Sequence, residues 1–401
     1  MKILFIAPRF PYPPLSGDQV RGYSQLKLLA YKHEVTLLTR EPNGDREGAI
    51  RKVEEVCERV VTVKKPPTMS GATRVARLAM ARMPIQTALE CDPSFARAAF
   101  VISRDSQFDL AHVQLARLGP VAASLPPGLP KVLDLIDALS VNMKRRAART
   151  SGPFSWAAQW EGKQMARYEK ALHSSFDEVV IASPADRAAI GDLANLSVVP
   201  NAIDLDVHRF VSAPREPNMI AFTGTMFYFP NVDAALWFSR DILPLVRRAI
   251  PEARTFVVGA RPIRAIRSLD GQSGITITGR VTSVHEYIGR AGVAVAPMRS
   301  GSGTQFKVLE AMAAGTPVVG TPLAFAGLDV VDGRDALVAS DPPEFARKVV
   351  QVLRKPEEFS QLTRNARRLV ETKYSVECTL KLLEAAYDRA IARHAPRFAA
   401  V

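Results

Sequence analysis

The sequence predicts an α/β protein made of two Rossmann-like domains, each with a doubly wound parallel sheet. The chain has 401 residues, which is long for one core and fits two domains of roughly 200 residues each. Short apolar runs typical of buried strands alternate with segments of helical periodicity, the βαβ pattern of a parallel sheet. A segment with prolines at 214 and 217 separates two such series.

These observations set the expected domain boundaries. The N-terminal domain covers residues 1–208, a linker covers 209–217, and the C-terminal domain covers 218–375. The last segment, 376–401, has helical periodicity, and we expect this helix to pack back on the first domain.

Composition indicates a soluble globular protein, with 47% hydrophobic and 23% charged residues. No apolar run reaches the roughly 18 residues that a membrane span needs, and residues 1–7 form too short a run for a signal peptide. Cys57, Cys91 and Cys378 are odd in number and far apart, which argues against a disulfide framework and favours a cytoplasmic location. The six histidines show no metal-ligand spacing, so no structural metal is expected.

The net charge of +13 indicates either an anionic partner or a basic surface that binds no particular partner. No nucleic-acid-binding motif accompanies the charge, so we expect no nucleic acid. A basic cluster at residues 144–149, followed by Trp156 and Trp160, favours an anionic bilayer at the inner face of the membrane, where lipid-linked acceptors would be met.

The elements follow in chain order. In the first half the expected strands are 2–7, 35–38, 60–63, 110–113, 132–136, 179–182 and 196–199, and the expected helices are 19–32, 49–58, 70–82 and 94–103. In the second half the expected strands are 219–222, 255–258, 275–278, 293–296 and 318–319, and the expected helices are 231–250, 302–314, 345–353, 358–371 and 376–394.

The loop after the first strand, residues 8–18, holds four prolines and lacks G-x-G-x-x-G, which excludes a dinucleotide fingerprint there. Gly17 at its end leaves room for a ligand phosphate. Asp18 is either a polar group of the site or the N-cap of the helix that follows.

One stretch in the second half has the strongest chemical signal. The apolar run 293–296 ends at Pro297, and a loop with two glycines leads into a helix. Ser302 and Gln305 have the spacing of a capping box, and Gly315 ends the helix. The unit is therefore a strand, a Gly-rich turn, a helix and a strand.

The charges in this unit indicate a nucleoside-diphosphate site. Backbone amides at a helix start favour an anion, and Lys307 adds a positive charge in the first turns. Glu310 lies one turn further on the same face, where a carboxylate can accept hydrogen bonds from ribose hydroxyls. Spacing alone leaves an alternative open, an ordinary helix cap with a solvated Lys–Glu pair.

The stretch APMRSGSGTQFKVLEAMA, residues 296–313, resembles the nucleotide-sugar site of retaining glycosyltransferases of family four, which have the two-domain GT-B fold with a cleft between the domains. It is most similar to exopolysaccharide-type and exosortase-associated sugar transferases, with the pattern PLR-x3-G-x-Q-x-KVLEAMA. Many family members carry E-x7-E here. Glu310 is the second glutamate, and Ser302 stands at the first.

Other segments carry the same resemblance. Gly17, Asp18 and Arg21 match a GD-x-x-R pattern, and His112 matches a D-x-x-H-x-H pattern except at Gln114. The segment DLIDALS, residues 134–140, followed by Glu161 and Glu169, and the run PNAID, residues 200–204, match further pieces of the subgroup and family patterns.

The resemblance implies a role for each matched residue. Catalytic roles fall on Arg299, Lys307, Asp18 and Asp137. Nucleotide-sugar contacts fall on Gly17, Gly224, Thr225, Arg280, Val281, Ser302, Gly303, Thr304, Gln305, Lys307 and Glu310. Acceptor-side contacts fall on Arg21, His112, Asp134 and Asp137. For His112 a packed or solvent-exposed histidine is the alternative, and for Asp137 a helix cap.

The implied activity is transfer of a sugar, with retention, from a nucleoside-diphosphate sugar to a glycan, lipid-linked or small-molecule hydroxyl, as in polysaccharide biosynthesis. Arg299 and Lys307 would stabilise the leaving diphosphate, so neither a metal nor any cofactor is expected. Two alternatives stay open. One is a nucleotide-sugar epimerase of the same fold, and the other is a nucleotide-sugar-binding partner without catalysis, which Ser302 in place of glutamate suggests.

Overall fold

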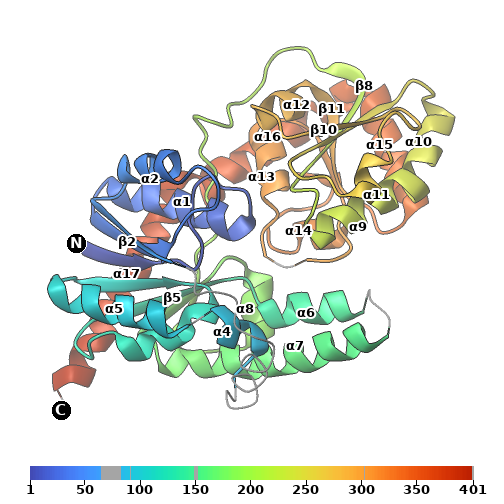
Figure 1. Ribbon diagram of the computed structural model, residues 1–401. Coiled ribbons are helices and arrows are strands. Elements are labelled where there is room, and N and C mark those ends of the chain that lie inside the picture. The colour runs from blue at the N-terminus through green and yellow to red at the C-terminus, as the bar shows by residue number, and fades with distance from the viewer. Residues whose placement is uncertain (65–82, 91, 149–151, 302, 400–401) are drawn as a thin grey trace. The chain divides into compact units, whose positions relative to one another are not determined.

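The computed structural model describes residues 1–64, 83–90, 92–148, 152–301 and 303–399, and the chain forms two compact units (Figure 1). Unit 1 comprises Met1–Pro200 with Thr379–Val401, and unit 2 comprises Asn201–Cys378. The boundaries expected from the sequence lie at 208 and 375. The expected helix 70–82 lies outside the described residues.

Unit 1 is built on a seven-stranded parallel sheet with the order β3-β2-β1-β4-β5-β6-β7. Its middle strands are buried along almost their whole length because helices cover both faces of a parallel sheet. Leu4 of β1 pairs with Thr36 on one side and with Ala111 on the other. The strands are β1 Lys2–Ile6, β2 Glu34–Arg40, β3 Arg59–Val63, β4 Leu110–Gln114, β5 Lys131–Ile136, β6 Glu178–Ile181 and β7 Leu196–Val198.

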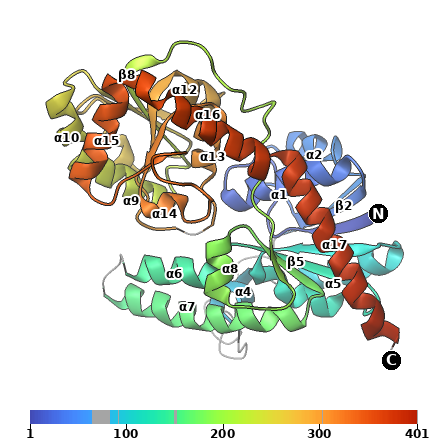
Figure 2. The same ribbon diagram turned by 180° about the vertical axis from the view of Figure 1, so that it is seen from behind.

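Helices connect these strands in the βαβ manner expected. Asp45 and Asp92 cap two of them by accepting hydrogen bonds from backbone amides of the first turn. The helices are α1 Gly17–Ala30, α2 Arg46–Glu54, α4 Ile85–Glu90, α5 Pro93–Asp105, α6 Leu139–Ala147, α7 Pro153–Ala171 and α8 Pro184–Ile190, with 3-10 turns at Ala116–Ser124 and Leu172–Ser174. Figures 1 and 2 show α6 and α7 side by side as a hairpin.

The C-terminal helix α17, Val376–Ala399, belongs to unit 1 from Thr379 onward (Figure 2). Tyr387 is fully buried, and its hydroxyl lies 2.9 Å from Nδ1 of His112. Glu384 accepts a hydrogen bond from Lys32, and Arg389 and Arg393 both pair with the buried Glu178. The helix is therefore part of the interior of unit 1.

Unit 2 has a six-stranded parallel sheet with the order β10-β9-β8-β11-β12-β13. The strands are β8 Glu216–Thr223, β9 Arg254–Val258, β10 Ile275–Gly279, β11 Ala291–Ala296, β12 Val318–Gly320 and β13 Leu337–Val338. The helices are α9 Phe229–Trp237, α10 Leu243–Ala249, α11 Arg264–Arg267, α12 Val284–Arg290, α13 Phe306–Ala313, α14 Pro322–Phe325, α15 Pro342–Arg354 and α16 Ser360–Leu369.

The single helix expected at 231–250 is interrupted. A π-helical turn, Phe238–Ile242, separates α9 from α10. Pro244, the second residue of α10, has no backbone N–H to donate, so the regular hydrogen-bond ladder cannot run through it.

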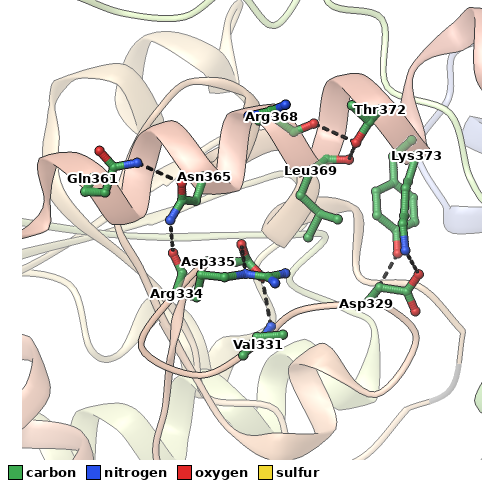
Figure 3. A network of polar contacts seen from close by, with 11 residues as sticks. Asp329, Val331, Arg334, Asp335, Gln361, Asn365, Arg368, Leu369, Thr372 and Lys373 are labelled. Carbon is green, nitrogen blue, oxygen red and sulfur yellow. Dashed lines mark hydrogen bonds and ion pairs between the residues drawn. The ribbon is translucent and has the colours of Figure 1, made fainter.

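A loop between α14 and β13 is tied to α16 and the turn after it by a polar network (Figure 3). The Lys373 ammonium pairs with Asp329 at 2.6 Å, and the Tyr374 hydroxyl accepts from the Asp329 amide at 2.9 Å. Further along the loop, Asn365 donates to the Arg334 carbonyl, and Asp335 accepts from the Val331 amide. The loop is thereby held at several points along its length.

Candidate functional site

The candidate site lies at the carboxyl ends of β8 and β11 in unit 2. These two parallel strands are neighbours in the sheet. From β8 the chain continues to β9 toward one edge of the sheet, and from β11 it continues to β12 toward the other edge. Open parallel sheets bind ligands at such a switch point. The turn after β8 holds Gly224, and the loop after β11 leads into α13.

Lys307, in the first turn of α13, points its ammonium group at this switch point. Nζ donates to the Asn231 side-chain oxygen at 2.5 Å and lies 3.4 Å from the Met298 sulfur. It also lies 4.9 Å from the ring centre of the buried Phe222. Among the described residues Lys307 has no carboxylate as an ion-pair partner, so a neutral amide and an aromatic ring hold its charge.

Glu310, one turn further along α13, shares this environment. Burial lowers the pKa of Lys307, and the nearby Glu310 carboxylate opposes that shift. Burial likewise raises the pKa of Glu310, opposed by Lys307. Burial thus destabilises the charged form of both groups. A ligand that offers complementary charged or hydrogen-bonding groups would therefore interact strongly with them.

Asn231 is positioned by the turn after β8. Its Nδ2 donates to the Thr225 carbonyl at 3.1 Å, which leaves Oδ1 for Lys307. Gly224 has a φ of +151°, and a Cβ at this position would lie 2.7 Å from Asn231 Nδ2. Gly224 is therefore required for Asn231 to pack where it meets Lys307.

Arg299 is placed differently from Lys307. Its guanidinium makes two hydrogen bonds to Asp233 of α9, at 2.5 and 3.2 Å, and lies 4.9 Å from the ring centre of Trp237. A bidentate pair stacked on an aromatic ring holds a guanidinium firmly. The charge that the sequence assigns to a diphosphate is thus neutralised by Asp233 in this structure.

The capping box expected between Ser302 and Gln305 is wrong, because α13 begins later than expected. Helix α13 begins at Phe306, and Gln305 is its N-cap residue without a side-chain cap hydrogen bond. Gly303 has a φ of +69°, so the chain is still in a turn where the sequence predicts the first helical residues. Ser302 lies outside the described residues, Thr304 is buried, and Gly303 and Gln305 are partly buried.

The Gly-rich loop packs against the loop of Figure 3. A Cβ added to Gly327 would lie 2.9 Å from the Gly303 carbonyl oxygen and 3.1 Å from the Thr304 Cα. The two backbones are therefore in close contact. Because Asp329 is fixed by Lys373 and Tyr374, this network supports the loop that precedes α13.

The remaining candidates of unit 2 follow β10 at the same edge of the sheet. Arg280 is exposed and Val281 is partly buried. Two strands separate β10 from β11, so these residues lie to the side of Lys307, and their contact with a base stays a prediction.

In unit 1, Gly17 and Asp18 are the first two residues of α1, and the Asp18 side chain is 15% exposed. Gly17 is exposed, and an added Cβ would meet no atom within 4 Å. Asp18 accepts from the Ser16 hydroxyl at 2.6 Å and pairs with Arg9 at 3.5 Å. The N-cap residue is Ser16, so the cap that was the alternative for Asp18 is wrong.

The acceptor-side prediction for Arg21, His112 and Asp134 does not fit their placement. All three are at most 2% exposed. Arg21 Nε donates to Asp134 at 2.7 Å, and the guanidinium also donates to the Val199 carbonyl. His112 is stacked on Phe5 with ring centres 4.4 Å apart, and burial lowers its pKa to about 4, so it is neutral near pH 7. These residues form an interior network, which is the packed role that was the alternative for His112.

Asp137 follows β5 and is partly buried. Helix α6 begins two residues later, and its start is held by Glu169, whose carboxylate accepts from the Ser140 amide and hydroxyl at 3.3 and 2.5 Å. Burial raises the pKa of Glu169 to about 7, and the Asp137 charge adds to that shift. Glu161 accepts from the amides of Ile85 and Gln86, each at 3.0 Å. Both glutamates thus serve helix starts.

The structure brings together Lys307, Glu310, Gly224 and Thr225. Sequence reasoning missed Asn231 as the partner of Lys307, and Asp233 with Trp237 as the partners of Arg299. The only signal is their position on the helix that follows the glycine turn, with Asn231 and Asp233 in its first turns and Trp237 at its end. Among the described residues no three His, Cys, Asp or Glu side chains gather as metal ligands.

Comparison with known families gives each unit an assignment. Residues 24–202 match the family described as "Glycosyl transferase 4-like domain", and residues 217–355 match "Glycosyl transferases group 1". No curated protein matches the chain in sequence.

Solved structures resemble the chain over nearly its whole length. Sucrose-phosphate synthase from Thermosynechococcus elongatus is 18% identical with a TM-score of 0.74, over 98% of this chain and 99% of that chain. HepE of Anabaena, solved with UDP-glucose, is 13% identical with a TM-score of 0.68, over 97% and 99%. WaaG, a glycosyltransferase involved in lipopolysaccharide biosynthesis, is 17% identical with a TM-score of 0.62, over 96% and 98%. The chain has the GT-B fold of these enzymes.

Proposed function

We propose that this chain, a GT-B glycosyltransferase by its two matched domains and its fold, binds a nucleoside-diphosphate sugar in unit 2 and transfers the sugar with retention. The observation that carries the proposal is Lys307 at the switch point between β8 and β11, held by Asn231 and without an ion-pair partner among the described residues. A diphosphate placed there would supply the missing negative charge. Neighbours solved with UDP and UDP-glucose support a uridine nucleotide as the first donor to test.

The acceptor in this proposal is a hydroxyl of a glycan or a lipid-linked glycan, as in polysaccharide assembly. The similarity of residues 296–313 to exopolysaccharide-type transferases supports this choice. Gly17, Asp18 and Asp137 are the unit 1 residues that keep enough exposure for an acceptor contact. Retention and acceptor class are tested together by NMR of the product formed from UDP-glucose and a panel of acceptors.

The Lys307→Ala variant tests the donor site. We expect UDP binding to weaken by about 2–4 kcal/mol, the range for removing one side of a desolvated charge pair. Isothermal titration with UDP measures this change. Lys381→Ala, which removes an exposed lysine of α17, is the matched control and should bind as the parent does. Unchanged UDP affinity in Lys307→Ala would take Lys307 out of the site.

Transfer in this proposal needs no divalent metal. The groups around Lys307 are an amide, a thioether and an aromatic ring, and no cluster of three potential metal ligands exists in the described parts of the chain. We therefore expect activity to survive EDTA, measured as UDP release from UDP-glucose with acceptor. Loss of activity in EDTA and recovery with magnesium or manganese would contradict this expectation.

A further inference from the structure

Helix α7 exposes a stripe of tryptophans and cations that the donor site does not use. Trp156 is 81% exposed and Trp160 is 51% exposed. Lys163, Arg167 and Lys170 continue the same helix and are also exposed. At 3.6 residues per turn, these five side chains fall within about 80° of arc around the helix axis. We call them the α7 stripe.

The stripe has no negative charge of its own. The only carboxylates of α7 are Glu161 and Glu169, and both turn inward to hold the starts of α4 and α6. In the parts of the chain that the structure describes, Lys163, Arg167 and Lys170 form no ion pair. The outward face of α7 therefore presents positive charge and aromatic surface together.

Two exposed tryptophans on one helix face are unusual for a surface that meets only water. Tryptophan favours the boundary between lipid chains and headgroups, and Lys and Arg extend their charged ends to headgroup phosphates. From Trp156 to Lys170 the stripe runs for about 21 Å at 1.5 Å per residue, in a straight line along one helix. A line of this kind fits a flat anionic surface.

We propose that the α7 stripe is the surface through which unit 1 docks on an anionic lipid bilayer. The charge complementarity between three unpaired cations and acidic headgroups, together with the exposed Trp156 and Trp160 on the same face, favours this occupant. Among the described residues no helix is long and apolar enough to cross a bilayer, so contact through α7 would be contact at the surface. The proposal extends the lipid-linked acceptor of the proposed function, and its test does not depend on catalysis.

The experiment is sedimentation of the full chain with vesicles of phosphatidylcholine alone and of phosphatidylcholine mixed with phosphatidylglycerol. We expect binding to the mixed vesicles, weaker binding at high salt, and a blue shift of tryptophan fluorescence on binding. The K163E/R167E/K170E variant should lose at least about 100-fold in vesicle affinity, since loss of each cation near an anionic surface accounts for about fivefold and the surface also repels the three new carboxylates. W156A/W160A should also bind less tightly.

The matched control is R264E/R267E/R347E, which reverses three exposed arginines of unit 2 and changes the net charge equally. It should bind vesicles as the parent does, and circular dichroism should show each variant folded. Equal losses in both triple variants would show that net charge alone drives binding and would overturn the assignment to α7. Absence of vesicle binding, or self-association of the parent that W156A/W160A abolishes, would overturn it as well.

The proposed function and this inference fail separately. UDP titration without vesicles reports on the donor site of unit 2 and should be unchanged in K163E/R167E/K170E. A parent that binds UDP but no vesicles overturns the docking surface alone, whereas one that binds vesicles but no UDP overturns the donor site alone.

Discussion

The contacts of Lys307 leave its ammonium group without a neutralising carboxylate among the described residues. Its bonded neighbours are an amide oxygen, a sulfur and an aromatic ring, none of which carries a formal charge. Arg299, eight residues before Lys307 in the sequence, is instead neutralised by Asp233. The two cations that look equivalent in sequence therefore differ in what they can offer an anion.

Glu310 is the residue that tests whether a ribose is bound beside this charge. Glu310→Gln keeps the shape and one acceptor but loses the charge-assisted part of the hydrogen bonds, so UDP binding at pH 8 should weaken by about 1–2 kcal/mol. The variant also removes the carboxylate that opposes the lowered pKa of Lys307, which acts in the same direction. Glu310→Ala should cost more, and isothermal titration measures both.

The control for Glu310 is Glu357→Gln, at an exposed position of unit 2. It should leave UDP affinity and the melting temperature unchanged. If both Glu310 variants bind UDP within twofold of the parent, Glu310 has no ribose contact.

Residue roles could be predicted from the sequence only where the local pattern carries them. Lys307 and Glu310 lie in a motif that predicts a nucleoside-diphosphate site, and this role stays a prediction. The partners of Arg299 and Lys307 lie on α9, and the pairings Arg299–Asp233 and Lys307–Asn231 span 66 and 76 positions. Arg21 and His112 match patterns by spacing, yet their burial depends on how strands β1, β4 and β5 align, which no short motif encodes.

At the scale of elements, the α6–α7 hairpin depends on a carboxyl group that prefers to be neutral. Burial raises the pKa of Glu169 to about 7 from an ordinary value near 4.5. The folded state therefore binds more protons than the unfolded state between these two pH values, and stability falls as pH rises through this range. Above pH 7 the buried charge is a cost that the hydrogen bonds from Ser140 only partly offset.

Glu169→Gln should remove this cost. The amide oxygen still accepts one hydrogen bond from Ser140, and no charge is buried. We expect the variant to stabilise the protein at pH 8 by about 1–3 kcal/mol relative to its effect at pH 5, measured by urea unfolding at the two pH values. Glu54→Gln, an exposed position on α2, is the control. The same difference from the parent at both pH values would contradict the argument.

Strands were easier to predict than helices. Most strands of the parallel sheets contain an apolar run because both faces are covered, and most of these runs mark the strand ends within a residue or two. The exceptions are β8, which begins three residues earlier than expected, and β13, where no strand is expected. Helix α7 was not predicted from the sequence. Its exposed face carries two tryptophans, so the apolar and polar residues do not separate onto two faces at the helical period. The break between α9 and α10 depends on Pro244, which the helical period of the surrounding residues conceals.

On the scale of the whole molecule, unit 2 is continuous in sequence and unit 1 is not. We expect the segment 201–378 produced alone to fold and to bind UDP in a Lys307-dependent way, because its core is made of its own residues. The segment 1–200 alone lacks the buried Leu383, Ala386, Tyr387 and Ala390 and should be protease-sensitive. Adding the peptide 379–401 should restore resistance. Equal resistance with and without the peptide would show that α17 is dispensable for unit 1.

The return of α17 to unit 1 also sets an order of events during protein synthesis. Residues of unit 2 have all left the ribosome once Cys378 emerges, so the unit that comes second in the gene is the first with a complete set of core residues. The surface around His112 stays uncovered until α17, which carries Tyr387, has been synthesised. A stop codon or frameshift near the end of the gene would thus damage unit 1 and leave unit 2 intact.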